Sequence, residues 1–213
     1  MRFWRVLLLT MSLLLFPVRL VDAEAPPSPS RTLAELQGLF PNLAQLPPGM
    51  VVQETGGRTA EDIAATFPDP VDALDALSLG SPTGNTPPIA SWAQPGAPLS
   101  TPARIEVSLH QFSSSGGAAY MLPYFAQGRA AMLGQQMQPA WLWGPCRGWV
   151  QSDGEATLYV RIGDLLARIT VVVQDGVTGY DVFVVKTNAA LNVASALLTN
   201  AGSSRQLLDQ TCQ

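Results

Sequence analysis

Side chains that could carry out chemistry are few in this sequence, and they are scattered. The 213 residues include one histidine, His110, and two cysteines, Cys146 and Cys212. No nucleophile elbow (G-x-S-x-G), phosphate-binding loop (G-x-x-x-x-G-K), zinc-protease motif (H-E-x-x-H) or dinucleotide-binding glycine pattern occurs. With one histidine and one cysteine pair, a zinc site would lack ligands. The sequence therefore predicts no metal site and no cofactor, and it names no catalytic residue.

Three residues remain as candidates for acid–base catalysis in an unrecognised hydrolase: His110, Asp153 and Glu155. They would have to converge in one cleft and include a carboxylate with a perturbed pKa. His110 occupies a polar position in a segment where apolar and polar residues alternate. We therefore expect it to point away from the core and to be exposed or lightly packed.

The sequence has two short acidic segments, and one of them invites a comparison with calcium sites. The segment 175–181 places carboxylate and hydroxyl oxygens around glycines, as calcium sites do, but it does not match the EF-hand loop. Its last residue, Asp181, is better explained as a helix cap. The segment 153–155 is expected to be a turn before a strand.

Three tryptophans gather in a short segment that also contains a cysteine. Trp141, Trp143 and Trp149 could line a groove for a sugar, a lipid or a peptide. The alternative is that these rings cover the open edge of the core while Cys146 holds the segment in place.

The first 23 residues have the layout of a secretory signal peptide. A positively charged start precedes the uncharged run 6–18, and small residues stand before the expected cleavage after Ala23. The alternative is an uncleaved anchor, but thirteen residues fall short of the roughly 20 that a spanning helix needs. The mature protein is therefore predicted to be secreted or periplasmic, without a stable membrane anchor.

Export changes how the two cysteines are interpreted. An isolated pair in an oxidising compartment predicts one disulfide, Cys146–Cys212. Such a bridge would stabilise the fold by about 4 kcal/mol in the chain-entropy model. The competing interpretation is a reactive Cys146 that works with His110, but no cysteine-protease signature surrounds it.

The charge balance argues against some classes of partner. Three basic residues and one acidic residue lie in the leader, so the mature chain keeps nine basic and fifteen acidic residues and a net charge of −6. Nucleic acids and anionic lipids attract clustered Lys and Arg, which this sequence lacks. The expected partner is a small molecule, lipid, sugar or peptide that the sequence does not identify, and not nucleic acid.

The hydrophobic pattern predicts a single α+β domain over residues 32–213, in which an antiparallel sheet packs against two main helices after a short helical N-terminal region. Residues 24–31 are expected to be a disordered entry segment, and 80–103 a Pro/Gly-rich loop. The expected strands are 50–55, 105–112, part of 147–151, 156–162 and 165–173, and the expected main helices are 115–133 and 181–200, with a kink or a late start at Pro123.

The turn Gly163-Asp164 suits a two-residue hairpin loop. In that register three apolar pairs share one face: Ile162 with Leu165, Val160 with Ala167 and Leu158 with Ile169. The other face carries Arg161 and Arg168, with Tyr159 opposite Arg168. These two arginines could bind an anion, although a solvated sheet face explains them equally well.

Four segments of the chain resemble a set of uncharacterised exported bacterial proteins. The similar segments are 46–70 (LPPGMVVQETGGRTAEDIAATFPDP), 105–112 (IEVSLHQF), 120–134 (YMLPYFAQGRAAMLG) and 155–172 (EATLYVRIGDLLARITVV). The order strand, helix, hairpin, helix also resembles exported lipoproteins and sensor domains of the Mog1/PsbP-like type, which implies an antiparallel sheet flanked by helices. Neither resemblance implies an activity.

We therefore expect an exported, non-catalytic binding or accessory module, with Trp141, Trp143, Trp149, Arg161 and Arg168 as the candidate ligand-binding residues. The alternatives are the hydrolase described above and a purely structural envelope protein.

Overall fold

The computed structural model describes residues 28–80, 86–133, 146–174 and 180–202. The predicted leader, Trp141, Trp143, Cys212 and residues 175–179 of the acidic segment lie outside the described residues. The predictions that concern them therefore stay predictions.

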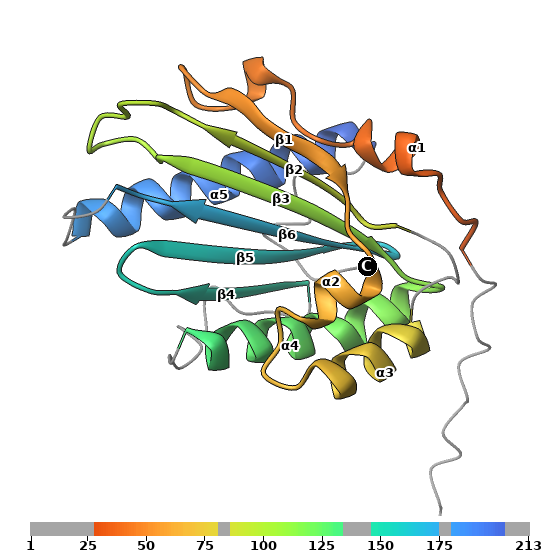
Figure 1. Ribbon diagram of the computed structural model, residues 1–213. Coiled ribbons are helices and arrows are strands. Elements are labelled where there is room, and N and C mark those ends of the chain that lie inside the picture. Colours follow the sequence, from red (N-terminus) through yellow and green to blue (C-terminus); the bar gives the residue numbers. More distant parts are fainter. Residues whose placement is uncertain (1–27, 81–85, 134–145, 175–179, 203–213) are drawn as a thin grey trace, which may run out of the picture.

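The centre of the fold is a six-stranded sheet in which every neighbouring pair is antiparallel, and this confirms the predicted α+β class (Figure 1). The strand order is β1-β2-β3-β6-β5-β4. The strands are β1 (Val51–Gly57), β2 (Pro88–Ala93), β3 (Arg104–Gln111), β4 (Arg147–Gln151), β5 (Glu155–Ile162) and β6 (Leu165–Val172).

Helices cover the two faces of this sheet differently. α5 (Tyr180–Asn200) crosses behind it, whereas α4 (Ser115–Met132) lies in front of β4 and β5, together with α2 (Ala60–Ala64) and α3 (Pro70–Gly80) (Figure 1). The short elements α1 (Leu33–Gln37) and η1 (Leu43–Gln45) lead into β1. None of the long helices in the described ranges lies in front of β1, β2 and β3 (Figure 1).

The hairpin of β5 and β6 has the predicted register. Ile162 pairs with Leu165, and Tyr159 pairs with Arg168. Gly163 has a φ of 62°, and Asp164 is not among the residues with positive φ, as the predicted type II′ turn requires. The apolar pairs of this hairpin therefore lie on one face, where α5 covers them.

Side-chain alternation divides the interior into two cores. On β3, Ile105, Val107 and Leu109 are fully buried on the face that α5 covers. On the other face a smaller core surrounds Phe125 of α4 and includes Phe67, which follows α2. This second core does not extend under β1 and β2.

α5 is long and apolar enough to cross a membrane by length and composition alone, among the helices in the described ranges. Its apolar stretch is 61% buried within the fold. Packing against β5 and β6 therefore accounts for its apolar composition.

Side chains cap the starts of α1 to α4, whereas Asp181, which was expected to be a cap, lies inside the first turn of α5. Thr32 and Glu35 form a capping box at α1, and Thr59 and Asp62 form one at α2. The Asp69 carboxylate accepts hydrogen bonds from the backbone of the first turn of α3. At α4, Ser114 is the cap and the helix continues through Pro123, so of the predicted kink or late start the late start does not occur.

The predicted loop 80–103 contains a strand that the sequence pattern did not indicate. β2 pairs with β1 on one side and β3 on the other, and Trp92 is buried against the core. Pro88 is tolerated because it is the first residue of the strand. The many flanking prolines and glycines concealed a segment of only six residues.

The described end of the predicted disordered segment 24–31 is tied to the sheet. Ser28 N donates to Ser113 O at 2.9 Å, and Gln111 Nε2 donates to Pro29 O at 2.8 Å. Arg31 contacts both Gln111 and Asp164. Prediction failed here because the partners are distant in sequence and show no pattern that the segment itself could reveal.

A substitution at Gly128 tests the packing contact between α4 and the segment after α2. A Cβ at this position would lie 2.5 Å and 2.7 Å from two ring atoms of Phe67, and that ring is held against Tyr124 and Phe125. We expect Gly128→Ala to lower the free energy of unfolding by ~1–2 kcal/mol, because overpacking outweighs the gain in helix propensity. Denaturant unfolding measures this change.

The matched control is Gly116→Ala in the same helix. The nearest atom to its added Cβ would be Ser114 Oγ at 3.6 Å, so we expect no loss of stability. Equal unfolding midpoints for the two variants would contradict this account of the contact.

Candidate functional site

Charged and hydroxyl side chains gather on the sheet face that points toward α4, which we call the polar face. β3 contributes Glu106, Ser108 and His110, and β6 contributes Arg168 and Thr170. Thr157 of β5 lies opposite Thr170. Strand alternation places all of these on one face, opposite the apolar residues that α5 covers.

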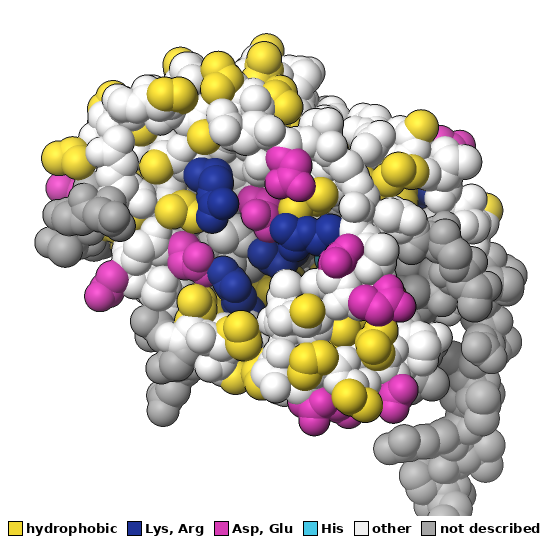
Figure 2. All heavy atoms as spheres, viewed as in Figure 1, with side chains coloured by type: hydrophobic (Ala, Val, Ile, Leu, Met, Phe, Trp, Pro, Cys, Tyr) yellow, Lys and Arg dark blue, Asp and Glu magenta, His cyan; other side chains and the backbone are white. Residues whose placement is uncertain are grey.

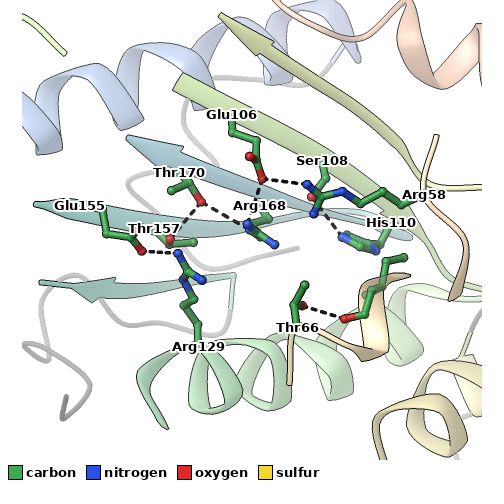
Figure 3. A network of polar contacts seen from close by, with 11 residues as sticks. Arg58, Thr66, Glu106, Ser108, His110, Arg129, Glu155, Thr157, Arg168 and Thr170 are labelled. Atoms are coloured by element: carbon green, nitrogen blue, oxygen red, sulfur yellow. Dashed lines mark hydrogen bonds and ion pairs between the residues drawn. The ribbon is translucent and has the colours of Figure 1, made fainter. Parts of the chain in front are cut away.

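Arg58, Arg129 and Arg168 pair with Glu106 and Glu155 on this face, and these five residues form what we call the arginine cluster (Figure 3). Arg168 Nη2 donates to Glu106 Oε1 at 2.9 Å, and Arg58 Nη2 lies 3.6 Å from the same oxygen. Arg129, from α4, pairs with Glu155 at the start of β5. Side-chain exposure across the cluster is between 13% and 27%, so these charges are half-buried and still within reach of solvent.

Two threonine hydroxyl groups lie between the Arg168–Glu106 and Arg129–Glu155 ion pairs. Thr157 Oγ1 and Thr170 Oγ1 are 3.0 Å apart, and Arg168 Nε donates to Thr170 Oγ1 at 3.4 Å. Both threonines are buried. Arg168 is therefore held from two sides, by a carboxylate and by a hydroxyl.

His110 is buried, so the expectation that it is exposed or lightly packed was wrong. Only 3% of the residue is exposed, and its ring centroid lies 4.8 Å from that of Phe125. Burial, with the positive charges of Arg168 and Arg58 nearby, lowers the pKa of His110 to about 3. The imidazole is therefore neutral near pH 7. The alternation of β3 placed it correctly on the polar face, but it could not show that α4 brings Phe125 over it.

The guanidinium groups of the cluster have hydrogen-bonding capacity to spare. Within the described ranges they make three hydrogen bonds, to Glu106, Thr170 and Glu155. Arg129 Nε is buried and has no partner among the described residues. An arginine presents a planar fork of N–H donors, so several of these donors remain available.

Figure 2 shows Lys and Arg side chains (dark blue) and Asp and Glu side chains (magenta) around a recess in the middle of this side of the molecule. In Figure 3 the same region lies between β6, α4 and the segment that carries Arg58. On the same face Ser108 Oγ lies 3.3 Å from His110 Nε2, and both side chains are buried.

Of the predicted ligand-binding residues, the structure describes Trp149, Arg161 and Arg168, and it does not bring these three together. Trp149 is fully buried in the core under α5, against Phe183, on the opposite face of the sheet from Arg168. Arg161 lies on the polar face, but it donates to Ser115 O at the start of α4. Burial lowers the pKa of Arg161. Arg168 alone of the described candidates lies in the cluster.

The three candidate acid–base residues do not share a cleft. Figure 3 shows Glu155 and His110 at opposite ends of the network. The backbone carbonyl of Asp153 accepts a hydrogen bond from the Lys186 ammonium group of α5. Burial lowers the pKa of Lys186. A hydrolytic site built from His110, Asp153 and Glu155 therefore lacks the required convergence.

Sequence reasoning missed Arg58, Glu106 and Arg129 as members of the site. Glu106 becomes a partner of Arg168 only because β3 pairs with β6, and the two strands are far apart in sequence. Arg129 stands on the helix face that points to the sheet, among apolar residues, and this was the one available signal.

Hollows also lie elsewhere in the described part of the protein. A cleft of about 260 Å³ lies at the hairpin turn beside Arg31, Asp164 and Asn200. A groove of about 560 Å³ runs between the segment 44–48 and α5, and the buried Ser195 hydroxyl beside it has no described partner. Neither brings charged groups with unused donors together as the arginine cluster does. Within the described ranges no group of three or more His, Cys, Asp or Glu residues could hold a metal ion.

Comparison with protein-family models and with curated proteins finds no match to this chain.

The neutral state of His110 predicts a pH dependence of stability. The unfolded chain binds a proton at this histidine near pH 6.5, whereas the folded protein does not until about pH 3, so stability is lost as pH falls below 6.5. From about pH 7 to about pH 5 we expect the wild type to lose ~2 kcal/mol more than His110→Gln. Denaturant unfolding at both pH values measures the difference.

Because the chain has one histidine, NMR gives an independent control. The ring resonance of His110 should not titrate across this range in the folded protein. A midpoint near 6.5 would contradict the burial described above.

The disulfide prediction concerns Cys146, which is buried at the start of β4, and Cys212, which is outside the described residues. Intact mass of the denatured mature protein after thiol alkylation, with and without prior reduction, tests the pair. We expect alkylation of both cysteines only after reduction. Two alkylated cysteines without reductant would refute the bridge.

Proposed function

We propose that the mature chain is an exported, non-catalytic binding module whose ligand binds on the polar face, at the arginine cluster. The observation that carries this proposal is the gathering of three half-buried arginines on one face, of which Arg129 has a buried Nε without a partner among the described residues. Arg129 and Arg168 each have a terminal nitrogen without a described partner, and their side chains are 20% and 13% exposed, so these groups can donate to an acceptor on a ligand.

A purely structural role explains the cluster less well. Half-buried ion pairs contribute little to stability, because removing charges from water offsets much of their attraction. Apolar side chains at Glu106, Arg168 and Arg129 could close this face as they do on the side of α5. The charged side chains are therefore better explained by binding than by folding.

The proposed location outside the cytoplasm depends on the predicted signal peptide. A signal peptide over 1–23 with cleavage after Ala23 would place the binding face outside the cytoplasm. The overall acidic charge supports a small ligand and not a nucleic acid.

A thermal-shift screen of the purified mature protein tests the proposal. Candidate sugars, lipids, peptides and small organic acids are compared on the wild type and on Arg168→Gln. We expect at least one class to raise the melting temperature of the wild type, because a ligand that binds only the native state stabilises it, and the shift should be smaller or absent in the variant.

The control variant is Arg104→Gln, which removes the same charge two residues from Glu106 on β3 but touches none of the cluster contacts. It should retain the ligand shift. A shift that Arg168→Gln retains in full would place binding elsewhere, and no shift with any class would contradict the proposal.

A further inference from the structure

We infer that the group recognised by the arginine cluster is an oxyanion, a carboxylate or phosphate on a small molecule, which Arg129 and Arg168 hold together while Glu106 acts as an internal competitor for Arg168. This inference rests on the proposed binding function and adds the chemical class of the ligand.

The guanidinium groups of Arg129 and Arg168 have donors to spare in a suitable geometry. Arg168 uses Nη2 and Nε on Glu106 and Thr170, and Arg129 uses Nη2 on Glu155, so one terminal nitrogen of each has no described partner. Figure 3 shows both guanidinium groups reaching the space in front of Thr157 and Thr170. Guanidinium forks match the paired oxygens of a carboxylate or phosphate better than they match a single hydroxyl.

One of these donors is buried. Arg129 Nε is inaccessible to solvent and unpaired among described residues, and it belongs to the same guanidinium group. A hydrogen bond between this arginine and an anion is stronger than one to a neutral acceptor, because both partners are charged. A neutral ligand would gain less from the same donors.

The charged groups around this space nearly balance one another. Glu106 and Glu155 face it from β3 and β5, and Arg58 also lies near the Asp62 carboxylate at the start of α2. His110 adds no charge because it is neutral. The cluster is thus close to charge balance, and an incoming oxyanion must compete with Glu106 for Arg168.

This competition gives a prediction with opposite signs for neighbouring residues. Glu106→Gln removes the competing charge but keeps the side-chain shape, so it should tighten oxyanion binding several-fold. Arg168→Gln should weaken binding about tenfold or more, since a hydrogen bond to a charged group is lost. Arg168→Lys keeps the charge without the fork and should also bind more weakly than the wild type.

Isothermal titration calorimetry on the mature protein uses matched pairs of probes. Galacturonate is compared with galactose, and glycerol 3-phosphate with glycerol, so that each pair differs in its anionic group. We expect the charged member of at least one pair to bind in the millimolar range or better, and the neutral member to bind more weakly. The stronger pair identifies carboxylate or phosphate. Arg104→Gln is the control for overall charge and should change affinity less than twofold.

Folding of each variant is checked by its unfolding midpoint. If Arg168→Gln does not fold, Glu155→Gln serves instead, because it frees Arg129 and should also tighten binding. Equal binding of charged and neutral members would overturn the oxyanion class and leave the binding function standing. Tighter binding by Arg168→Gln, or no saturable binding of either charged probe, would overturn the inference outright.

Discussion

The whole arrangement depends on the alternation of side chains across one antiparallel sheet. Every strand presents alternate residues to opposite faces, so β3, β5 and β6 each carry an apolar row toward α5 and a largely polar row toward α4. The apolar row excludes water along the length of α5 and holds the sheet in place. The sheet can therefore keep charged groups on its other face without losing its core.

The second face is closed only in part. α4 covers β4 and β5 and brings Phe125 over His110, but no long helix of the described residues covers the front of β1 to β3. Arg129 and Arg168 lie where this cover ends. Residues at such a boundary are dry enough for strong hydrogen bonds and open enough for a ligand to enter.

Much of the fold was predictable, because the controlling signals are local. The capping boxes at Thr32 and Thr59 and the hairpin at Gly163 follow from residues a few positions apart. β2 was missed because its six residues stand between proline- and glycine-rich stretches and are defined by neighbours on both sides. The docking of Ser28 depends on a backbone carbonyl at Ser113, which no local pattern reveals.

The site was predictable only in one member. Arg168 could be placed on the polar face from its own hairpin, but its partner Glu106 comes from β3 and Arg129 comes from α4. The tryptophan hypothesis failed for Trp149 for the same kind of reason. Its position on β4 turns the ring under α5, and that depends on the pairing of β4 with β5.

The most direct test of the account is an NMR titration of the arginine Nε–Hε groups in the mature protein with galacturonate and with glycerol 3-phosphate. The account predicts that the signals of Arg129 and Arg168 shift together and saturate with one of these probes, while those of Arg104 and Arg161 stay unchanged. Signals from Arg129 and Arg168 that do not move with either probe, or equal shifts at all four arginines, would contradict it.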